Sequence, residues 1–475
     1  MGCAASKITT LNAAENSDTT LATAAELGVG ETRLALWRKN GGGDLEPVLA
    51  SGAVALLDAQ WVISHAEAGG VLTHRQALPK EAFLSLADLV KAINYSRVSV
   101  PVIGLPVTVL SYPWLTKDHP DPLGTSLSRV AKALKALCSD VTYIYGRLGV
   151  FWDFGSLHQH PDPANGVMRT EEQDTLFKRG LGCLGTLYSH PETRVLRLTS
   201  FPDGHKTEDQ ADGTNVAAYF DRGWCFTESS WASLTKSGRL SLDLGLMRDD
   251  EEYSCVSLVD ECTKGGGRRP PLLPSRFAAE LETKSFTNGK DDKPLVTRLY
   301  AAAFEEQFGK ATGLRYVRLG WGDAEAAQVA EVLASGAAPD LKELYLGYNQ
   351  IGVDGCKALA AALGKEGAAP RLEELYLSYN KIGDEGCEAL TAALKEGAVP
   401  RLKMLYLEGN TIGEKGCKAL AAALVEGAAP SLKPHRSPHR PSRVQTLFVG
   451  SKPPELVAVC KERGIYLELY IDGRR

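Results

Sequence analysis

Hydrophobic and polar positions repeat with a fixed period in the C-terminal third of the chain. Three copies begin at Leu341, Leu372 and Leu402, so their starts lie 31 and 30 residues apart. Each copy reads L-x-x-L-x-L-x-x-N and continues with apolar residues at helical spacing. This pattern predicts a short strand with inward-pointing leucines, followed by a helix that packs behind it. A degenerate earlier copy aligns from Leu314, with Val317 at the position of a later leucine.

Asparagine, glycine and proline mark the ends of the predicted elements in these copies. The asparagine that follows each strand can satisfy backbone groups where the chain turns toward the helix. A glycine ends each helix, and a proline three residues later prevents its continuation. These residues are Asn349, Asn380 and Asn410; Gly367, Gly397 and Gly427; and Pro370, Pro400 and Pro430.

The repeat pattern resembles the ribonuclease-inhibitor type of leucine-rich repeat. The resemblance implies an α/β solenoid whose concave strand face binds a protein partner. Tyrosines that recur on this face are candidate binding anchors, or they only cover one another. Repeats of this type also occur in activators of small GTPases, so a small-GTPase regulator is a further alternative, for which we identify no residue. The candidate protein-binding residues are Tyr316, Tyr345, Tyr376, Tyr406, Lys342, Glu374 and Lys403.

The pattern breaks after the third copy and then resumes. Residues 434–441 form a basic, proline-rich insertion that we expect to be a loop. Residues 444–449 read as a strand, 454–463 as a helix and 465–471 as a strand. These last elements are expected to cap the open end of the solenoid.

Strands and helices alternate in the central region of the chain. Buried strands are predicted at residues 107–112, 148–154 and 194–198, with helices at 127–137 and 170–188 between them. This order predicts a parallel sheet with helices on both faces. Binding sites in such sheets lie outside the carboxyl ends of the strands. The polar residues expected at that edge are Ser111, Tyr112, Asp153 and the segment from Arg222 to Glu228.

Three short motifs at that edge resemble known immune and self-recognition modules. They are Ser111-Tyr112 after the first strand, Trp152-Asp153 after the second, and R-G-W-C-x-x-E at 222–228. Together they resemble the fungal HET domain and the TIR domain, which share a flavodoxin-like fold. In NAD-cleaving TIR enzymes the helix glutamate is catalytic, and this role carries over to Glu228.

The resemblance leaves two classes of function open for the central domain. As an enzyme it would be an NAD hydrolase, with NAD as substrate and Glu228 as the acid that stabilises the cationic ribose. Trp224 would then offer a stacking face, and Asp153 and Tyr112 would be its neighbours. As an interaction module it would associate with copies of itself, and Arg222 would pair with Glu228 and hold it in place. We favour the module over the enzyme.

The N-terminus matches a lipidation signal. Met1-Gly2-Cys3-Ala4-Ala5-Ser6 fits the N-myristoylation pattern with Gly2 as acceptor. One myristoyl chain anchors a protein weakly, so a second acyl chain on Cys3 is expected. These acyl chains would place the protein on the cytoplasmic face of the plasma membrane.

Composition and charge narrow the remaining choices. The net charge of −5 argues against a general nucleic-acid binder. No run of 18 apolar residues exists, so a transmembrane helix is not expected. We expect no metal site and no bound cofactor, because neither a Cys/His cluster nor a P-loop is present. The predicted organisation is a tether at 1–30, a small α/β region at 31–99, a TIR/HET-like domain at 100–308 and the solenoid at 309–475. The leading function is protein recognition and signalling at a membrane.

Overall fold

The computed structural model describes residues 21–93, 104–139, 147–264, 268–432, 446–449, 454–462 and 466–469. The chain divides into two compact units, and each is considered by itself. The first unit, the sheet domain, comprises Met1–Ala232, Arg239–Lys264 and Phe277–Ala303. The second unit, the repeat domain, comprises Ser233–Gly238, Gly265–Arg276 and Phe304–Arg475. Gly2 and Cys3 lie outside the described residues, as does the insertion at 434–441.

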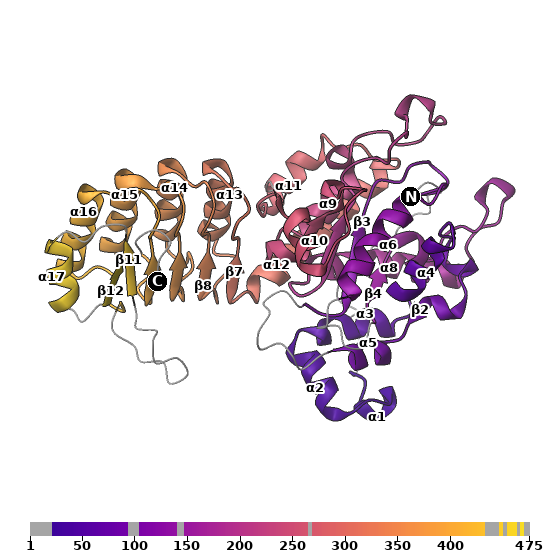
Figure 1. The fold of residues 1–475 in the computed structure, drawn as a ribbon, viewed down its shortest axis with the longest axis horizontal. Coiled ribbons are helices and arrows are strands. Elements are labelled where there is room, and N and C mark those ends of the chain that lie inside the picture. Colours follow the sequence, from indigo (N-terminus) through magenta and orange to yellow (C-terminus); the bar gives the residue numbers. More distant parts are fainter. Residues whose placement is uncertain are drawn as a thin grey trace. The chain divides into compact units, whose positions relative to one another are not determined.

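A mixed sheet of six strands organises the sheet domain (Figure 1). The four strands β4, β3, β5 and β6 run parallel; the sequence predicts the first three of them in a parallel sheet, and β6 was not predicted. Strand β1 pairs antiparallel with both β4 and β2, so the sheet is not parallel throughout. In the order in which they pair, the strands are β2 (Phe83–Leu84), β1 (Leu56–Asp58), β4 (Gly149–Phe151), β3 (Val107–Ser111), β5 (Arg194–Arg197) and β6 (Ser241–Asp243).

Helices cover both faces of this sheet. On one face, α6 (Thr125–Cys138) packs beside α4 (Ala59–Glu67) and α10 (Cys255–Cys262) over a common apolar core. On the other face lie α8 (Glu171–Ser189) and α9 (Gly223–Trp231), where Tyr188 contacts Phe151 and Trp231. The remaining helices are α1 (Ala24–Leu27), α2 (Glu31–Lys39), α3 (Glu46–Ala50), α5 (Leu86–Ala92), α7 (Asp153–Ser156), α11 (Pro274–Leu281) and α12 (Gly289–Gly309).

The described part of the predicted region 31–99, residues 31–93, contributes to the same sheet as the central region. It supplies β1 and β2, which extend the four parallel strands at one side. The amphipathic pattern from Ala82 predicts a helix, yet β2 takes its first residues and α5 starts only at Leu86. The helix starts there because Ser85 and Asp88 form a reciprocal capping box. Residues 31–93 and the parallel strands therefore share one fold.

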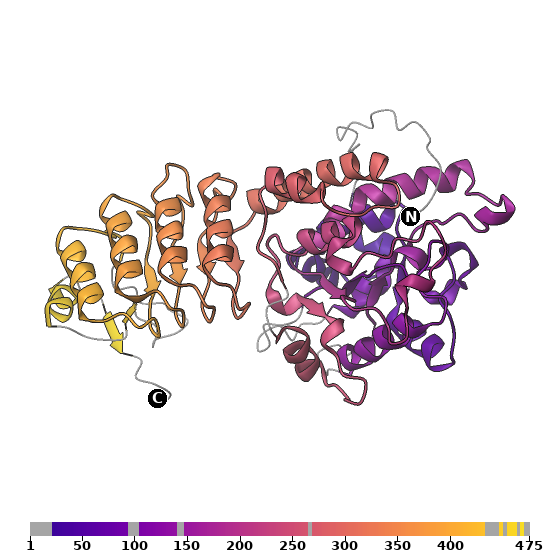
Figure 2. The same ribbon diagram turned by 90° about the horizontal axis from the view of Figure 1, so that it is seen from above.

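The repeat domain is a parallel sheet whose strands follow one another in chain order, with one helix after nearly every strand (Figures 1 and 2). The last helix and strand continue this order, as predicted for the end of the solenoid. The strands are β7 (Gly313–Arg315), β8 (Glu343–Tyr345), β9 (Glu374–Tyr376), β10 (Met404–Tyr406), β11 (Thr446–Val449) and β12 (Tyr466–Leu469). The helices are α13 (Asp323–Ala334), α14 (Val353–Leu363), α15 (Gly383–Lys395), α16 (Glu414–Val425) and α17 (Pro454–Glu462).

Buried asparagines connect each copy to the one before it. The Asn380 amide donates to the carbonyls of Leu346 and Leu377, and its oxygen accepts from the Ile351 N–H. Asn349 and Asn410 make equivalent bonds to the copies that precede theirs. These side chains satisfy the backbone where each strand ends, as the sequence predicts.

Aspartates at the helix starts connect some copies on the helix side. Asp323 Oδ1 accepts from the N–H groups of Gly352 and Gly355 in the next copy, at 2.6 and 3.0 Å. Asp384 does the same for Gly413 and Gly416, at 2.7 and 2.9 Å. Val353 occupies the corresponding position in the copy between them, and its side chain cannot accept a hydrogen bond.

The first copy has a different register from the one that the leucine pattern predicts. Leu314 pairs with Leu344, so it occupies the central strand position and not the first leucine of the motif. The small Ala311 takes the place of that first leucine, and its lack of bulk hides the true start of the copy. Tyr316 consequently falls at the inward position of Leu346 and is fully buried.

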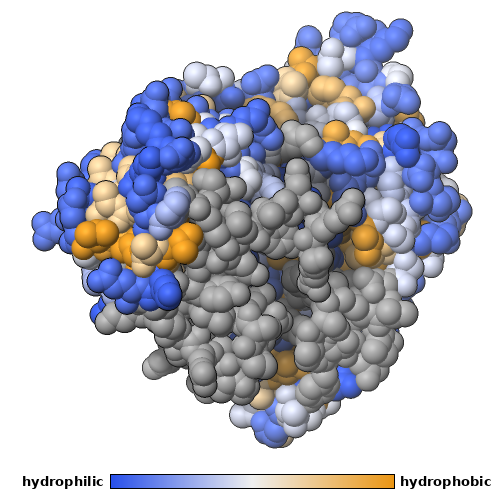
Figure 3. Space-filling view, turned by 60° about the vertical axis from the view of Figure 1, so that its left-hand side comes forward, coloured by the Kyte–Doolittle hydropathy of each residue, from blue (hydrophilic) through white to orange (hydrophobic). Residues whose placement is uncertain are grey.

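Two observations describe how apolar the helices and the surface of the described residues are. Among the described residues, no helix is both long and apolar enough to cross a bilayer. Figure 3 shows one face on which most of the coloured residues are hydrophilic, with smaller apolar patches between them.

Candidate functional site

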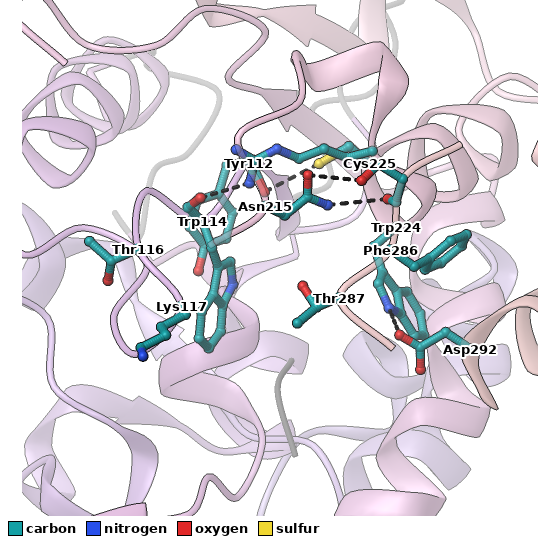
Figure 4. Close-up of a pocket in the computed structure, with 12 residues that line it drawn as sticks. Tyr112, Trp114, Thr116, Lys117, Asn215, Trp224, Cys225, Phe286, Thr287 and Asp292 are labelled. Atoms are coloured by element: carbon teal, nitrogen blue, oxygen red, sulfur yellow. Dashed lines mark hydrogen bonds between the residues drawn. The ribbon is translucent and has the colours of Figure 1, made fainter. Parts of the chain in front are cut away.

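A pocket opens at the carboxyl edge of the sheet domain (Figure 4). Its walls come from the segment after β3, from the start of α9 and from the segment that begins α12. Trp114 and Trp224 stand on opposite sides of it, with Thr287 between them. The lining residues are Tyr112, Trp114, Thr116, Lys117, Asn215, Arg222, Trp224, Cys225, Ser285, Phe286, Thr287 and Asp292.

The R-G-W segment is held against one wall of this pocket. The Trp224 Nε1 donates to Asp292 at 2.9 Å, and burial raises the pKa of that carboxyl above its ordinary value. Gly223 lies so close to Phe286 that a Cβ would come within 1.9 Å of the ring. Glycine is therefore required there by packing. Asp292 and Phe286 lie about 70 and 60 residues beyond the motif, and nothing in the sequence connects them with it.

Tyr112 and Asp153 are in direct contact, as their places at two neighbouring strand ends predict. The Tyr112 hydroxyl donates to Asp153 Oδ1 at 2.6 Å, and Trp114 Nε1 donates to Oδ2 at 3.1 Å. Burial is the main cause that raises the pKa of Asp153. Tyr112 lines the pocket, whereas Asp153 lies behind it. Trp114 is a further residue of this group that the sequence analysis did not single out.

Glu228 is buried beneath the same edge. Its carboxyl accepts a hydrogen bond of 2.6 Å from Ser111 Oγ, which is also 2.7 Å from the Tyr219 hydroxyl. Burial raises the pKa of Glu228 well above its ordinary value, and the charge of Asp153 adds to this effect. Glu228 is 8% exposed and does not line the pocket. In this structure the carboxyl is therefore a buried acid that favours its protonated form.

Arg222 does not pair with Glu228, so the salt bridge considered from the sequence is wrong. The Arg222 guanidinium donates to the Trp114 carbonyl at 2.7 Å and to the Ala217 carbonyl at 2.7 Å. It joins two loops at the pocket rim instead. These neutral backbone carbonyls lie within hydrogen-bond distance of the guanidinium. A bond to them does not require a second charged group to be buried.

A ladder of aromatic side chains follows the strands of the repeat domain. Tyr345 stacks on Tyr376 with ring centroids 4.2 Å apart, and Tyr376 stacks on Tyr406 at 3.6 Å. Tyr316 was predicted as the earlier rung of this ladder, and that prediction is wrong. The side chain is buried, and its hydroxyl donates to the Leu234 carbonyl in the interior. Arg315 takes that rung, and its guanidinium lies 4.7 Å from the centroid of Tyr345.

A second row runs beside this ladder and was not predicted. The Tyr348 and Tyr379 rings stack at 4.4 Å, and the Arg318 guanidinium lies 4.2 Å from the Tyr348 centroid. Arg318, Tyr348 and Tyr379 have φ angles of 59°, 58° and 56°, in the left-handed region that such residues rarely adopt. The next copy has Gly409 at this position, with φ 69°. In two copies a tyrosine directly precedes the motif asparagine, and this recurrence in the sequence could have revealed the row.

The charged candidates on the same face have different surroundings. Lys342 is exposed. Glu374 is half-buried and accepts a hydrogen bond of 2.8 Å from the Tyr345 hydroxyl. Lys403 forms an ion pair of 2.7 Å with Glu373. Lys342 and Lys403 hold equivalent positions in their copies, next to the ladder, and Glu374 contacts it directly.

A family described as Leucine Rich repeat matches residues 337–360 and 370–390. The C-terminal part of the chain carries leucine-rich repeats. No curated protein matches the chain. The repeats therefore give the repeat domain its likeness to known proteins, and the sheet domain is an α/β domain of unspecified family.

No metal centre is visible in the described part of the chain. Within those residues, no group of three or more His, Cys, Asp or Glu side chains is placed to hold a metal ion. The cysteines at the recurring helix position are buried, and burial raises the pKa of Cys356 and of Cys387 to about 12. These thiols remain protonated and act as apolar packing groups.

Proposed function

We propose that the protein recognises a protein partner through the strand face of its leucine-rich repeats. The observation that carries this proposal is the pair of parallel aromatic rows, Tyr345–Tyr376–Tyr406 and Tyr348–Tyr379. Stacked rings present a large area that loses little conformational freedom on binding. Tyrosine is also among the residues that contribute most to protein interfaces.

The backbone geometry of the second row supports a role at the surface. A left-handed conformation costs a residue other than glycine roughly 1–2 kcal/mol. Gly409 shows that the turn can be built with a residue that avoids this strain. Tyr348 is nevertheless 44% exposed, so burial of its ring does not explain its place there. Binding of a partner is a reason for a strained, exposed tyrosine.

Replacement of Tyr345, Tyr376 and Tyr406 together by Ala is expected to weaken partner capture at least tenfold, because anchor residues contribute more than ~1 kcal/mol each. Affinity capture from the native cell, with quantitative mass spectrometry, compares the proteins held by wild type and variant. Lys357→Ala on the helix side is the matched control and should capture the wild-type set. Capture of that same set by the triple variant would place the binding surface elsewhere.

We also propose that acyl chains on Gly2 and Cys3 hold the protein at the cytoplasmic face of the plasma membrane. The support is the sequence signal alone. Signalling at that membrane would follow from recognition by a protein anchored there.

Gly2→Ala is expected to move the protein from the membrane fraction to the soluble fraction, because myristoylation is lost and acylation of Cys3 depends on it. Cys3→Ser should leave weak, reversible binding. Fractionation of cells that express each variant measures both. A Gly2→Ala protein that stays with the membrane would contradict acylation as the anchor.

A second candidate function is hydrolysis of NAD by a TIR/HET-like sheet domain. The observation in its favour is the pocket at the carboxyl edge, to which Trp224 and Tyr112 contribute. Its walls of two indole rings suit a flat nitrogen ring. Against it, Glu228 lies behind the pocket and favours its protonated form. Catalysis would require a rearrangement that exposes this carboxyl, as self-association of the domain would provide.

The NAD proposal predicts that concentrated purified protein releases nicotinamide from NAD, and that Glu228→Gln abolishes the release. Chromatography of the reaction mixture measures both. Trp224→Phe keeps an aromatic wall and should retain most of the activity. Wild-type protein without nicotinamide release, even when assembled on vesicles, would leave the protein-recognition proposal alone.

A further inference from the structure

A buried cation without a counter-ion lines the pocket between Trp114 and Trp224 (Figure 4). Arg222 is only 5% exposed, and its two hydrogen bonds go to the neutral carbonyls of Trp114 and Ala217. Carbonyl oxygens satisfy N–H groups, but they do not neutralise the charge. Burial lowers the pKa of this guanidinium below its ordinary value, and no carboxylate among the described residues counteracts that shift.

The uncompensated charge of Arg222 favours an anion in the pocket. A buried charge destabilises a fold unless an opposite charge accompanies it. The second cation that lines the pocket, Lys117, is exposed and likewise forms no ion pair within the described part of the chain. A negatively charged ligand would provide the partner that the protein itself does not supply to either cation.

One carboxyl group also lines the pocket, but it does not neutralise Arg222. Asp292 lies on the Trp224 side of the pocket, where it accepts the hydrogen bond of 2.9 Å from the indole N–H (Figure 4). It is not among the charges that shift the pKa of Arg222. Burial raises the pKa of Asp292 and so disfavours its charged form. The charges that line the pocket are therefore mainly positive.

The uncharged walls indicate what the rest of the ligand is like. Trp114, Trp224 and Phe286 are half-buried, so part of each ring stays open to the pocket. The two indoles stand on opposite sides, where a flat ring between them would contact both. The volume of the pocket is about 70 Å³. This is small beside the roughly 300–1,000 Å³ of sites that enclose drug-sized ligands. The pocket therefore suits a small anionic group and the edge of a ring, and not a whole nucleotide.

We propose that this pocket binds a small aromatic carboxylic acid. The carboxylate accepts hydrogen bonds from the Arg222 guanidinium, which has a matching planar shape. The ring leaves the pocket between Trp114 and Trp224, beside the Thr287 hydroxyl. The proposal goes beyond NAD cleavage and does not rest on it. Nicotinamide, which NAD cleavage would release, has no charge for Arg222 to bind.

Calorimetric titration of the purified full-length chain with nicotinate and with nicotinamide tests the proposal. The two molecules share one ring and differ in that nicotinate has a carboxylate where nicotinamide has a neutral amide. We expect saturable binding of nicotinate that is at least tenfold tighter than binding of nicotinamide, because hydrogen bonds to a charged group are the stronger ones. Acetate, which lacks the ring, should also bind at least tenfold more weakly than nicotinate. Nicotinate should raise the melting temperature of the wild type more than an equal concentration of nicotinamide does.

Arg222→Gln and Arg222→Lys are a matched pair of variants. Both lose the guanidinium that contacts the two carbonyls, and only Arg222→Lys keeps a positive charge. Arg222→Gln should weaken nicotinate binding at least tenfold, and Arg222→Lys should retain more of it. Lys80→Ala, at an exposed position outside the pocket, is the control and should bind nicotinate like wild type. If neither Arg222 variant folds, the preference of the wild type for nicotinate still decides.

Four results would overturn the proposal. One is the absence of saturable nicotinate binding at millimolar concentration. A second is equal affinity for nicotinate and nicotinamide, since the pocket would then recognise a ring and not a charge. A third is equal affinity for nicotinate and acetate, which would exclude the contacts with the indoles. The last is a folded Arg222→Gln protein that binds nicotinate like wild type. Release of nicotinamide from NAD is measured separately, so neither outcome of that assay decides this one.

Discussion

Leu375→Asp is expected to unfold the repeat domain. Leu375 is 1% exposed and lies between Leu344 and Leu405 on the neighbouring strands. An aspartate there would be a buried charge without a partner, which costs several kcal/mol. That cost is a large part of the 5–15 kcal/mol by which a typical protein is stable. Circular dichroism and limited proteolysis should show loss of the repeat helices and rapid cleavage between residues 340 and 430.

Lys342→Asp is the matched control for this experiment. It places the same carboxylate on the strand side of the same region, but at an exposed position. The free energy of unfolding of the control should stay within about 0.5 kcal/mol of the wild-type value. A Leu375→Asp protein that resists proteolysis as wild type does would contradict the inward direction of the motif leucines.

Glu228→Gln is expected to make the sheet domain more stable than wild type at about pH 8, and no more stable at about pH 4. Burial raises the pKa of Glu228 in the folded protein well above the ordinary 4.5. An acid of this kind binds its proton more tightly in the folded state. Its contribution to stability is therefore largest below pH 4.5 and is lost as the pH rises toward the folded pKa. Each unit of pKa difference corresponds to about 1.4 kcal/mol.

Denaturant titrations across that pH range measure the difference between wild type and variant. A smaller slope should remain in Glu228→Gln, because burial also raises the pKa of Asp153. Ser111→Ala is an informative companion, because it removes the donor that stabilises the charged form of Glu228 and should steepen the wild-type slope. A Glu228→Gln protein that is less stable by 1–3 kcal/mol at every pH would mean that the folded domain needs the ionised carboxylate.

The repeat domain was the more predictable part of the fold because each copy solves the same packing problem. Leucine spacing, the asparagine at each strand end and the helix that follows are all local signals, and three copies reinforce one another. Prediction failed in the first copy, where Ala311 replaces the leading leucine and shifts the apparent register. That shift made Tyr316 look like a surface rung although it is a buried residue.

The sheet domain was predictable only where a strand lies within a continuous run of apolar residues or between clear helices. Strands β3, β4 and β5 are buried throughout and stand out in the sequence. Strand β2 has two residues, and polar residues interrupt the apolar pattern at β6, so neither gives a clear signal.

The same limit applies to the candidate site. The positions of Tyr112 and Asp153 at the ends of neighbouring strands predict that they are in contact, and the structure shows this contact. The partner of Arg222 could not be inferred, because backbone carbonyls leave no mark in a sequence. Nor could the contact between Trp224 and Asp292, since it joins segments far apart in the chain.

The valine at position 353 divides the solenoid into pairs of copies. Carboxylates at 323 and 384 tie the first copy to the second and the third to the fourth on the helix side. Between α14 and α15 that tie is missing. The Cys356 thiol donates to the Gly386 carbonyl at 3.3 Å there, as Cys387 does to Gly416 in the next copy, and Lys357 forms an exposed ion pair of 3.1 Å with Glu385. If the solenoid bends or frays, the seam between these two helices should open first, and each pair should move as one piece. A surface that spans the seam could then adjust its curvature to a partner without breaking either pair.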